Sequence, residues 1–103
     1  MSKYLVNKFM HVVNMNQEAE EAYVENPPGF LHQWEKGERL EFTAEERRAL
    51  ERRDYGSLYA MGAHPFLLWS FTEAIWRHEV DREELVKDYK EKAAAAGYPD
   101  FES

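Results

Sequence analysis

The residues best suited to metal chemistry are four histidines, because the chain has no cysteine. A zinc motif of the H-E-x-x-H kind places two histidines four positions apart on one helix, and no second histidine follows His78-Glu79 at that spacing. A non-haem iron site needs two histidines and a carboxylate. His32 and Glu35 could share a helical face, but the second histidine would have to arrive from elsewhere. We therefore expect no metal site and no catalytic residue in this chain.

The sequence also contains no recognisable motif for nucleophilic or acid-base catalysis. Ser57 lies in Gly56-Ser57-Leu58, which is not the G-x-S-x-G turn of hydrolases. The acid pairs Glu45-Glu46 and Glu83-Glu84 belong to charged segments, so we expect solvated helix faces there. A small iron or zinc enzyme built from His32, His64 and nearby carboxylates stays open as a weaker alternative.

His64 differs from the other histidines because it precedes Pro65, and a residue before proline is biased toward an extended backbone. This placement predicts a helix entrance. The imidazole there either caps the helix or is presented to a partner, at an interface or at the mouth of an active site.

The composition bounds the class of protein. The chain has 103 residues, which indicates one domain, here residues 1–103. Its formal net charge is −7, so it lacks the basic surface that a nucleic-acid partner or an anionic membrane requires. No apolar run approaches the roughly 20 residues of a membrane span, and the first residues lack the apolar centre of a signal peptide. We expect a cytoplasmic protein.

The elements that must position these residues are helices. Asn16, Thr43 and Asp54 are suitable N-caps, and Gly37 and Gly97 are suitable C-terminal stops. Capping and apolar periodicity predict helices over 3–15, 17–25, 30–36, 44–53, 55–63, 65–79 and 82–96. Alternation of period two is absent, which argues against strands. We predict an all-α fold, a small irregular domain of five to seven helices without a sheet, and a loose tail over 98–103.

The segment 65–76 is unusually apolar for a helix of so small a domain. On a helical wheel its large side chains spread over roughly 220° of arc, whereas packing on one side needs a stripe of about 100°. The surplus must be covered by other helices of this chain or by another protein. Trp69 and Trp76, seven residues apart, lie on nearly the same face and are the first candidates for anchors. The candidate interface or lid residues are Tyr55, Tyr59, His64, Pro65, Phe66, Trp69 and Trp76.

Two groups of segments resemble the small (alpha, LigA-type) subunit of LigAB-type extradiol ring-cleavage dioxygenases, such as protocatechuate 4,5-dioxygenase. The first is Asn7-Lys8-Phe9-Met10, followed by an acidic helix and Phe30-Leu31-His32-Gln33-Trp34. The second is Phe42-Thr43, then Arg53-Asp54-Tyr55-Gly56-Ser57-Leu58-Tyr59 and Met61-Gly62-Ala63-His64-Pro65-Phe66-Leu67-Leu68. Together they cover about residues 4–71. The His64-Pro65 segment and the last predicted helix depart from the protocatechuate type, so no substrate contact is carried over.

The resemblance implies a non-catalytic subunit that packs beside a large catalytic subunit and helps to close its active site. The large subunit would supply the Fe(II) ligands and the catalytic base, so Fe(II) is expected in the partner and no cofactor in this chain. The reaction would open a catechol-type ring with O₂, as in aromatic compound catabolism, with the catecholic substrate at the shared site. The alternative is a stand-alone helical domain that binds a peptide or another protein, as a monomer or a homo-oligomer.

Overall fold

The computed structural model describes residues 4–96, and these form seven α-helices without a strand among them. The all-α prediction is confirmed for this part of the chain. The predicted Gly97 stop and the predicted tail 98–103 lie outside the described residues. The helices are α1 (Tyr4–Met15), α2 (Gln17–Glu25), α3 (Pro27–Glu38), α4 (Ala44–Glu51), α5 (Tyr55–Ala60), α6 (Pro65–Trp76) and α7 (Arg82–Ala96).

Three predicted N-caps are confirmed. The Asn16 side chain accepts from the Ala19 amide at the start of α2, and Asp54 accepts from the Ser57 amide at the start of α5, each at 3.1 Å. Thr43 opens α4 through a reciprocal capping box, in which its backbone amide donates to Glu46. These caps satisfy amide groups that have no partner inside the helix, which is why the starts could be read locally.

The third helix differs from its prediction at both ends. Asn26-Pro27-Pro28-Gly29 does end α2, but it also begins α3, because the Asn26 side chain accepts from the Gly29 amide and Pro27 occupies the first helical turn. Gly37 is inside the helix rather than its stop. The helix ends instead at Arg39, which adopts a left-handed backbone with φ of 60°.

The predicted ends of the next three helices were too late. Helix α4 ends in a Schellman turn, where Arg53 is left-handed (φ 54°) and the Asp54 amide donates to the Ala49 carbonyl at 2.8 Å. Helix α5 ends in the same way, with Gly62 in the left-handed position (φ 97°). Glycine favours this conformation and arginine does not, so only the second stop had a sequence signal. Helix α6 ends at Trp76 rather than at Glu79.

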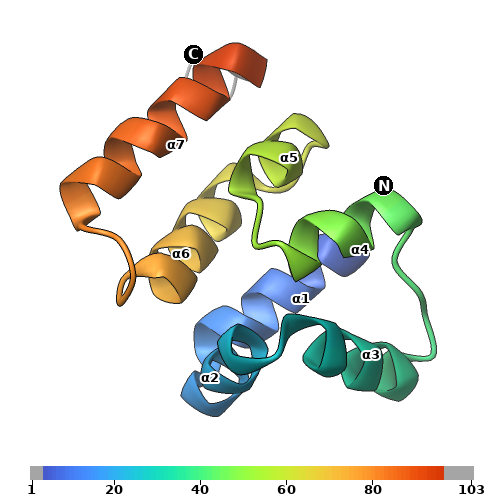
Figure 1. Cartoon of the computed structure of the whole chain (residues 1–103). Helices are drawn as coiled ribbons and strands as arrows, with labels where there is room; N and C mark the ends of the chain where they lie inside the picture. Colours follow the sequence, from blue (N-terminus) through green and yellow to red (C-terminus); the bar gives the residue numbers. More distant parts are fainter. Residues whose placement is uncertain (1–3, 97–103) are drawn as a thin grey trace.

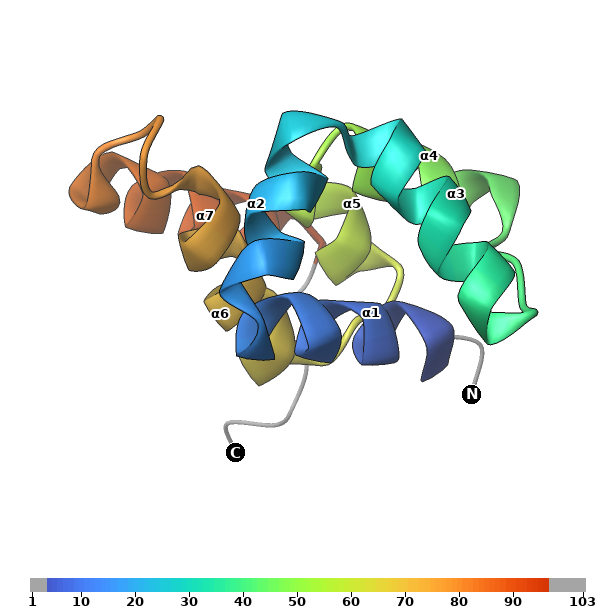
Figure 2. The same ribbon diagram turned by 90° about the horizontal axis from the view of Figure 1, so that it is seen from below.

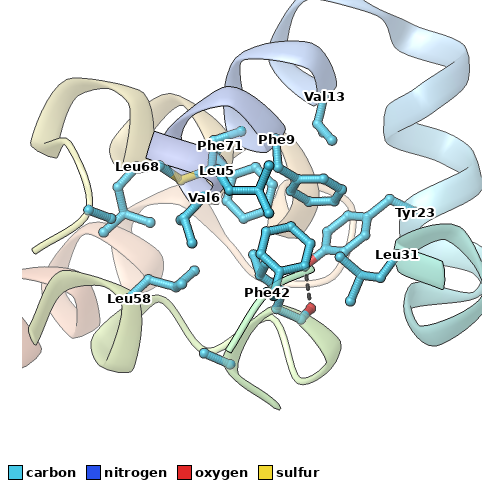
Figure 3. Close-up of a cluster of buried hydrophobic side chains, with 14 of the residues drawn as sticks. Leu5, Val6, Phe9, Val13, Tyr23, Leu31, Phe42, Leu58, Leu68 and Phe71 are labelled. Atoms are coloured by element: carbon cyan, nitrogen blue, oxygen red, sulfur yellow. Dashed lines mark hydrogen bonds between the residues drawn. The ribbon is translucent and has the colours of Figure 1, made fainter. Parts of the chain in front are cut away.

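The main core is built around the ring of Phe9. This side chain is fully buried and packs edge-on against rings from four other parts of the chain, at centroid distances of 5.2–6.2 Å. Those rings are Tyr23, Phe30, Trp34, Phe42 and Phe71. Figure 3 shows Phe9, Tyr23 and Phe42 turned toward one another. Apolar periodicity predicts a buried face of the first helix, made of Leu5, Val6, Phe9, Met10, Val12 and Val13. All of these are buried except Val12, which is partly exposed.

Helix α6 is central to the packing. It contacts α1, α2, α5 and α7, so most of its wide apolar arc is covered by the chain itself. Helix α7 lies at one side, against α5 and α6 (Figure 1). The view from below shows α7 at the opposite end of the molecule from α3 and α4 (Figure 2).

Three glutamates are largely buried, although carboxylates usually lie in solvent. Glu46 belongs to a pair that the sequence predicts to be solvated, and it is 2% exposed because its carboxylate serves the capping box of α4. Glu35 is buried between α3 and α4, where it accepts from the Phe42 amide at 2.8 Å and pairs with Arg47. The third is Glu20, which pairs with Arg77. The ion-pair partners of Glu20 and Glu35 lie 57 and 12 positions away, whereas the partner of Glu46 is its own capping residue, three positions earlier.

Candidate docking surface

The segment that the sequence singles out forms a corner, here called the His64–Phe66 corner, between α5 and α6. His64 has the extended backbone expected before proline (φ −61°, ψ 123°), and Pro65 is the first residue of α6. The His64 Nδ1 atom accepts from the Leu67 amide at 3.4 Å, so the imidazole caps the helix. The ring remains exposed, and its centroid lies 5.9 Å from that of Phe66. The histidine thus caps α6 and also faces solvent.

Helix α1 holds this corner in place. The Asn7 side chain accepts from the His64 backbone amide at 2.9 Å, across a separation of 57 residues. One turn further into α6, Asn14 donates to the Leu67 carbonyl at 3.3 Å. Both bonds join α1 to the first turn of α6. They fix the direction in which the imidazole and Phe66 leave the surface, as a docking corner requires.

Large apolar side chains are exposed at the corner and on α1. Phe66 is 71% exposed, and Tyr4 and Met15 on α1 are exposed to a similar degree. Burying a side chain of this size against a partner stabilises the contact by about 1.5–3 kcal/mol. The corner therefore has apolar area to offer a partner beside a polar group that can orient it.

Three of the other predicted interface residues lie elsewhere, beneath α7. Tyr55 and Tyr59 of α5 and Trp69 of α6 all pack against the ring of Tyr89, at centroid distances of 5.0–5.9 Å. Leu85 and Ala93 of α7, four residues to either side of Tyr89, are buried. We call this contact the α7 seam, formed by Tyr55, Tyr59, Trp69, Leu85, Tyr89 and Ala93. The tertiary structure thus divides the predicted interface between the corner and the seam.

Two tyrosine hydroxyls at the seam differ in their hydrogen bonding. The Tyr55 hydroxyl donates to Asp88, whose carboxylate also accepts from Lys92 at 2.9 Å. These two hydrogen bonds, that of Tyr55 first, lower the pKa of Asp88. The Tyr89 hydroxyl, by contrast, is buried without a hydrogen-bond partner. Burial, with a smaller contribution from Tyr59, raises the pKa of Tyr89 to about 12.

Trp76, the remaining candidate, is held by Arg53, a residue that sequence reasoning missed. The Trp76 indole donates to the Arg53 carbonyl at 3.2 Å, and the guanidinium lies 4.2 Å from the indole centroid. The same guanidinium donates to both carboxylate oxygens of Glu79, at 2.7 and 3.0 Å. Trp76 is therefore tied to its own chain on two sides. Arg53 is one of five arginines between residues 39 and 53, and nothing in the sequence distinguishes it as the one that binds Trp76.

A hollow of about 690 Å³ lies between α3 and α4. It is lined by cations and anions together, so it selects no single charge. Its charged lining residues are Glu35, Lys36, Arg39, Glu41, Arg47 and Glu51, with His32 beside them. Among residues 4–96, no three histidine, aspartate or glutamate side chains are grouped as a metal site requires. Within the same range, no helix has the length and apolarity to cross a membrane.

Comparison with known proteins finds no match: no family model, no curated sequence and no solved structure corresponds to this chain.

Proposed function

We propose that this chain is the small, non-catalytic subunit of a two-subunit Fe(II)/O₂ extradiol dioxygenase that opens catechol-type rings. The large subunit would hold the iron, its ligands and the catalytic base. This chain would cover the large subunit's active site with the His64–Phe66 corner. The proposal extends the sequence resemblance described above to a role for a defined surface.

One observation carries the proposal: the two groups of segments behind the resemblance meet at the corner. Asn7, from the first group, accepts the backbone hydrogen bond of His64, from the second. Phe9 of the first group also packs against Phe42 of the second. Residues that are distant in sequence thus form one unit, and that unit presents the exposed imidazole and phenyl ring. A surface that covers an active site needs such a fixed orientation, because a misplacement of about 1 Å can cost a hundredfold in rate.

The direct experiment is co-expression with an extradiol catalytic subunit, ideally one encoded next to this chain. We expect a stable complex that consumes O₂ with a catechol, whereas the chain alone should neither bind iron tightly nor turn over catechols. Catechol cleavage by the purified chain with stoichiometric iron would refute the proposal. So would a failure to associate with any such subunit.

Point variants locate the contact. Phe66→Ala should weaken assembly because it removes exposed apolar area from the corner, and His64→Asn should change turnover more than assembly. Asparagine keeps the capping of α6, since it is a good N-cap residue. Met15→Ala removes an equally exposed side chain from the end of α1, which is not part of the corner, and is the matched control. Circular dichroism should show unchanged helicity in all three.

The alternative function is a stand-alone helical interaction domain. The observation that favours it is the spread of exposed apolar side chains beyond the corner, at Tyr4, Met15 and Leu40. This function predicts that Phe66→Ala leaves the behaviour of the protein unchanged and that the chain never associates with a dioxygenase subunit. The co-expression experiment separates the two functions.

A further inference from the structure

The link between α6 and α7, residues 77–81, contains no helix-breaking residue. Its sequence is Arg77-His78-Glu79-Val80-Asp81, without glycine or proline. Helical hydrogen bonding continues into it, because the Val80 amide donates to the Trp76 carbonyl at 3.0 Å, four residues earlier. The local signal for a new helix is Asp81, whose side chain accepts from the Glu83 amide at 3.2 Å at the start of α7. No glycine or proline of the link requires the chain to turn.

The turn is held instead by ion pairs to other parts of the chain. Glu79, in the link, is bound by Arg53 through both of its carboxylate oxygens. Arg82 of α7 reaches back to Glu73 of α6 at 2.7 Å, and both side chains are partly or largely exposed. Arg77 pairs with Glu20 of α2 at 3.3 Å. The Arg82–Glu73 pair is weak and is screened by salt because both side chains are exposed. Arg53 and Glu20 are only 17% and 12% exposed, so their pairs with Glu79 and Arg77 hold the turn more firmly and are screened less.

The α7 seam is the only broad contact that α7 makes among the described residues, since α7 touches α5 and α6 and no other helix extensively. Its fit is specific. Leu85, Tyr89 and Ala93 repeat every four residues and cover one face, and Asp88 accepts from Tyr55. The face formed by Tyr55, Tyr59 and Trp69 therefore fits α7. The same fit is available to α7 of a second copy of the chain.

We propose that this protein forms a dimer by exchange of α7 with a second copy of the chain. In this dimer the link straightens, α6 and α7 become one helix, and α7 of each copy covers Tyr55, Tyr59 and Trp69 of the other. A straight helix from Pro65 to Ala96 would be about 48 Å long, so its α7 end could no longer reach its own α5. Each seam is then formed by residues from both copies, with Tyr89 and Asp88 supplied by the second copy.

Exchange of an identical element costs little because the seam contacts are the same in the closed monomer and in the dimer. Concentration therefore decides between them. The monomer is favoured in dilute solution by the short link, and the dimer fraction should rise with protein concentration. It should also rise with salt, because salt weakens the ion pairs that bend the link.

Introduced cysteines test whether α7 is exchanged. A Cβ placed on Gly56 would lie 3.4 Å from the Cβ of Lys92, close to the 3.5–4.5 Å that is usual across a disulfide. The chain has no cysteine of its own, so no native cysteine has to be replaced first. Gly56→Cys and Lys92→Cys are prepared as separate proteins, mixed at high concentration and oxidised. Exchange of α7 should give a disulfide-linked dimer that contains one chain of each kind.

Two controls make the cysteine result decisive. The double variant Gly56→Cys/Lys92→Cys should form its bond within one chain when dilute, which shows that α7 lies on α5. A mixture of Met15→Cys with Lys92→Cys should give no specific dimer. If the double variant closes within one chain but the mixture yields no linked dimer, α7 is not exchanged and the proposal is wrong. A double variant that fails to close also contradicts it.

Variants at Arg82 test the straight link with a matched pair. Arg82→Pro and Arg82→Ala both remove the pair with Glu73. Proline is well tolerated at the first position of α7 in the bent monomer but breaks a continuous helix, so the dimerisation constant should fall at least about a hundredfold. Alanine favours the continuous helix, so the constant should rise about threefold.

Light scattering after size exclusion, over a range of concentrations, measures both constants. The proposal is overturned if Arg82→Pro and Arg82→Ala dimerise equally. It is also overturned if neither they nor the unaltered chain dimerises at millimolar concentration.

Discussion

Two aromatic rings organise two regions of this molecule, and the regions differ in kind. Phe9 is fully buried among rings from α2, α3, α6 and the segment before α4, and the Tyr23 hydroxyl there donates to the Leu50 carbonyl. Tyr89 is half-buried between α7 and the α5–α6 face, and three of its neighbours carry polar atoms. Close packing of rings around a fully buried centre stabilises the first region, whereas the second is only partly buried and includes the Tyr89 hydroxyl, which is buried without a partner. We infer that the first region defines the fold and the second is its separable part.

The largest expected effect comes from breaking the first region. Phe9→Ala should lower the free energy of unfolding by about 3–5 kcal/mol, since it leaves a cavity where five rings meet. Tyr89→Ala should release α7 and leave the other helices folded. Urea unfolding followed by circular dichroism measures both. If Tyr89→Ala unfolds the whole domain as readily as Phe9→Ala, the two regions are not separable.

The next effect concerns Arg53, which lies between the two regions. Arg53→Ala removes the bonds to Glu79 and to the Ile75 carbonyl, and should cost about 1–3 kcal/mol. Arg53→Gly loses the same bonds but relieves the left-handed backbone, so it should be less destabilising than alanine by about 1 kcal/mol. Thermal unfolding of the two variants compares them. Equal stabilities would mean that the left-handed backbone is not strained.

A smaller pair of effects has opposite signs within the seam. Tyr55→Phe loses the hydrogen bond to Asp88 and should loosen α7 by about 1 kcal/mol. Tyr89→Phe removes a buried hydroxyl that has no partner and should tighten α7 by a similar amount, roughly 1 kcal/mol. Amide hydrogen exchange of α7 reports both changes. Loosening by Tyr89→Phe would show that its hydroxyl has a partner after all.

The smallest effect is on pH dependence. The Tyr55 hydrogen bond, followed by that of Lys92, holds the pKa of Asp88 below its ordinary value of 3.8. A depressed folded-state pKa adds stability that is fully present well above pH 3.8 and is lost as the pH falls through the folded pKa. Docking of α7 should therefore weaken below about pH 4, as amide exchange would show. In Tyr55→Phe this pH dependence should shrink, and an unchanged profile would assign it to another group.

Local signals in the sequence account for the starts of the helices better than for their ends. Asn16, Thr43 and Asp54 cap helices as predicted, since capping involves residues only three positions apart. Three helices end earlier than periodicity predicts. At α4 the reason is a left-handed arginine, which has no sequence signature. Helix α6 ends earlier than predicted, at a link held by ion pairs. These pairs involve residues up to 57 positions apart in the sequence.

The candidate site was predicted only as a set of residues. The His64-Pro65 pair predicted a helix entrance, and in the structure the imidazole caps α6 and is exposed. Its presentation to a partner stays a prediction. The sequence could not separate Phe66, which is exposed, from Trp69, which lies against Tyr89. Periodicity places both on one broad apolar arc, and the helices that cover that arc come from other parts of the chain.

By itself, the sequence determined that this protein is helical, where most helices begin and which face of α1 is buried, because caps and periodicity act over a few residues. Only the tertiary structure decided that Phe9 contacts five rings, that Glu20 and Glu35 are buried, and that α7 covers Tyr55, Tyr59 and Trp69. Those outcomes depend on contacts between distant segments. The break before residue 82 was predicted from the sequence, whereas the direction in which α7 turns back depends on ion pairs with other parts of the fold.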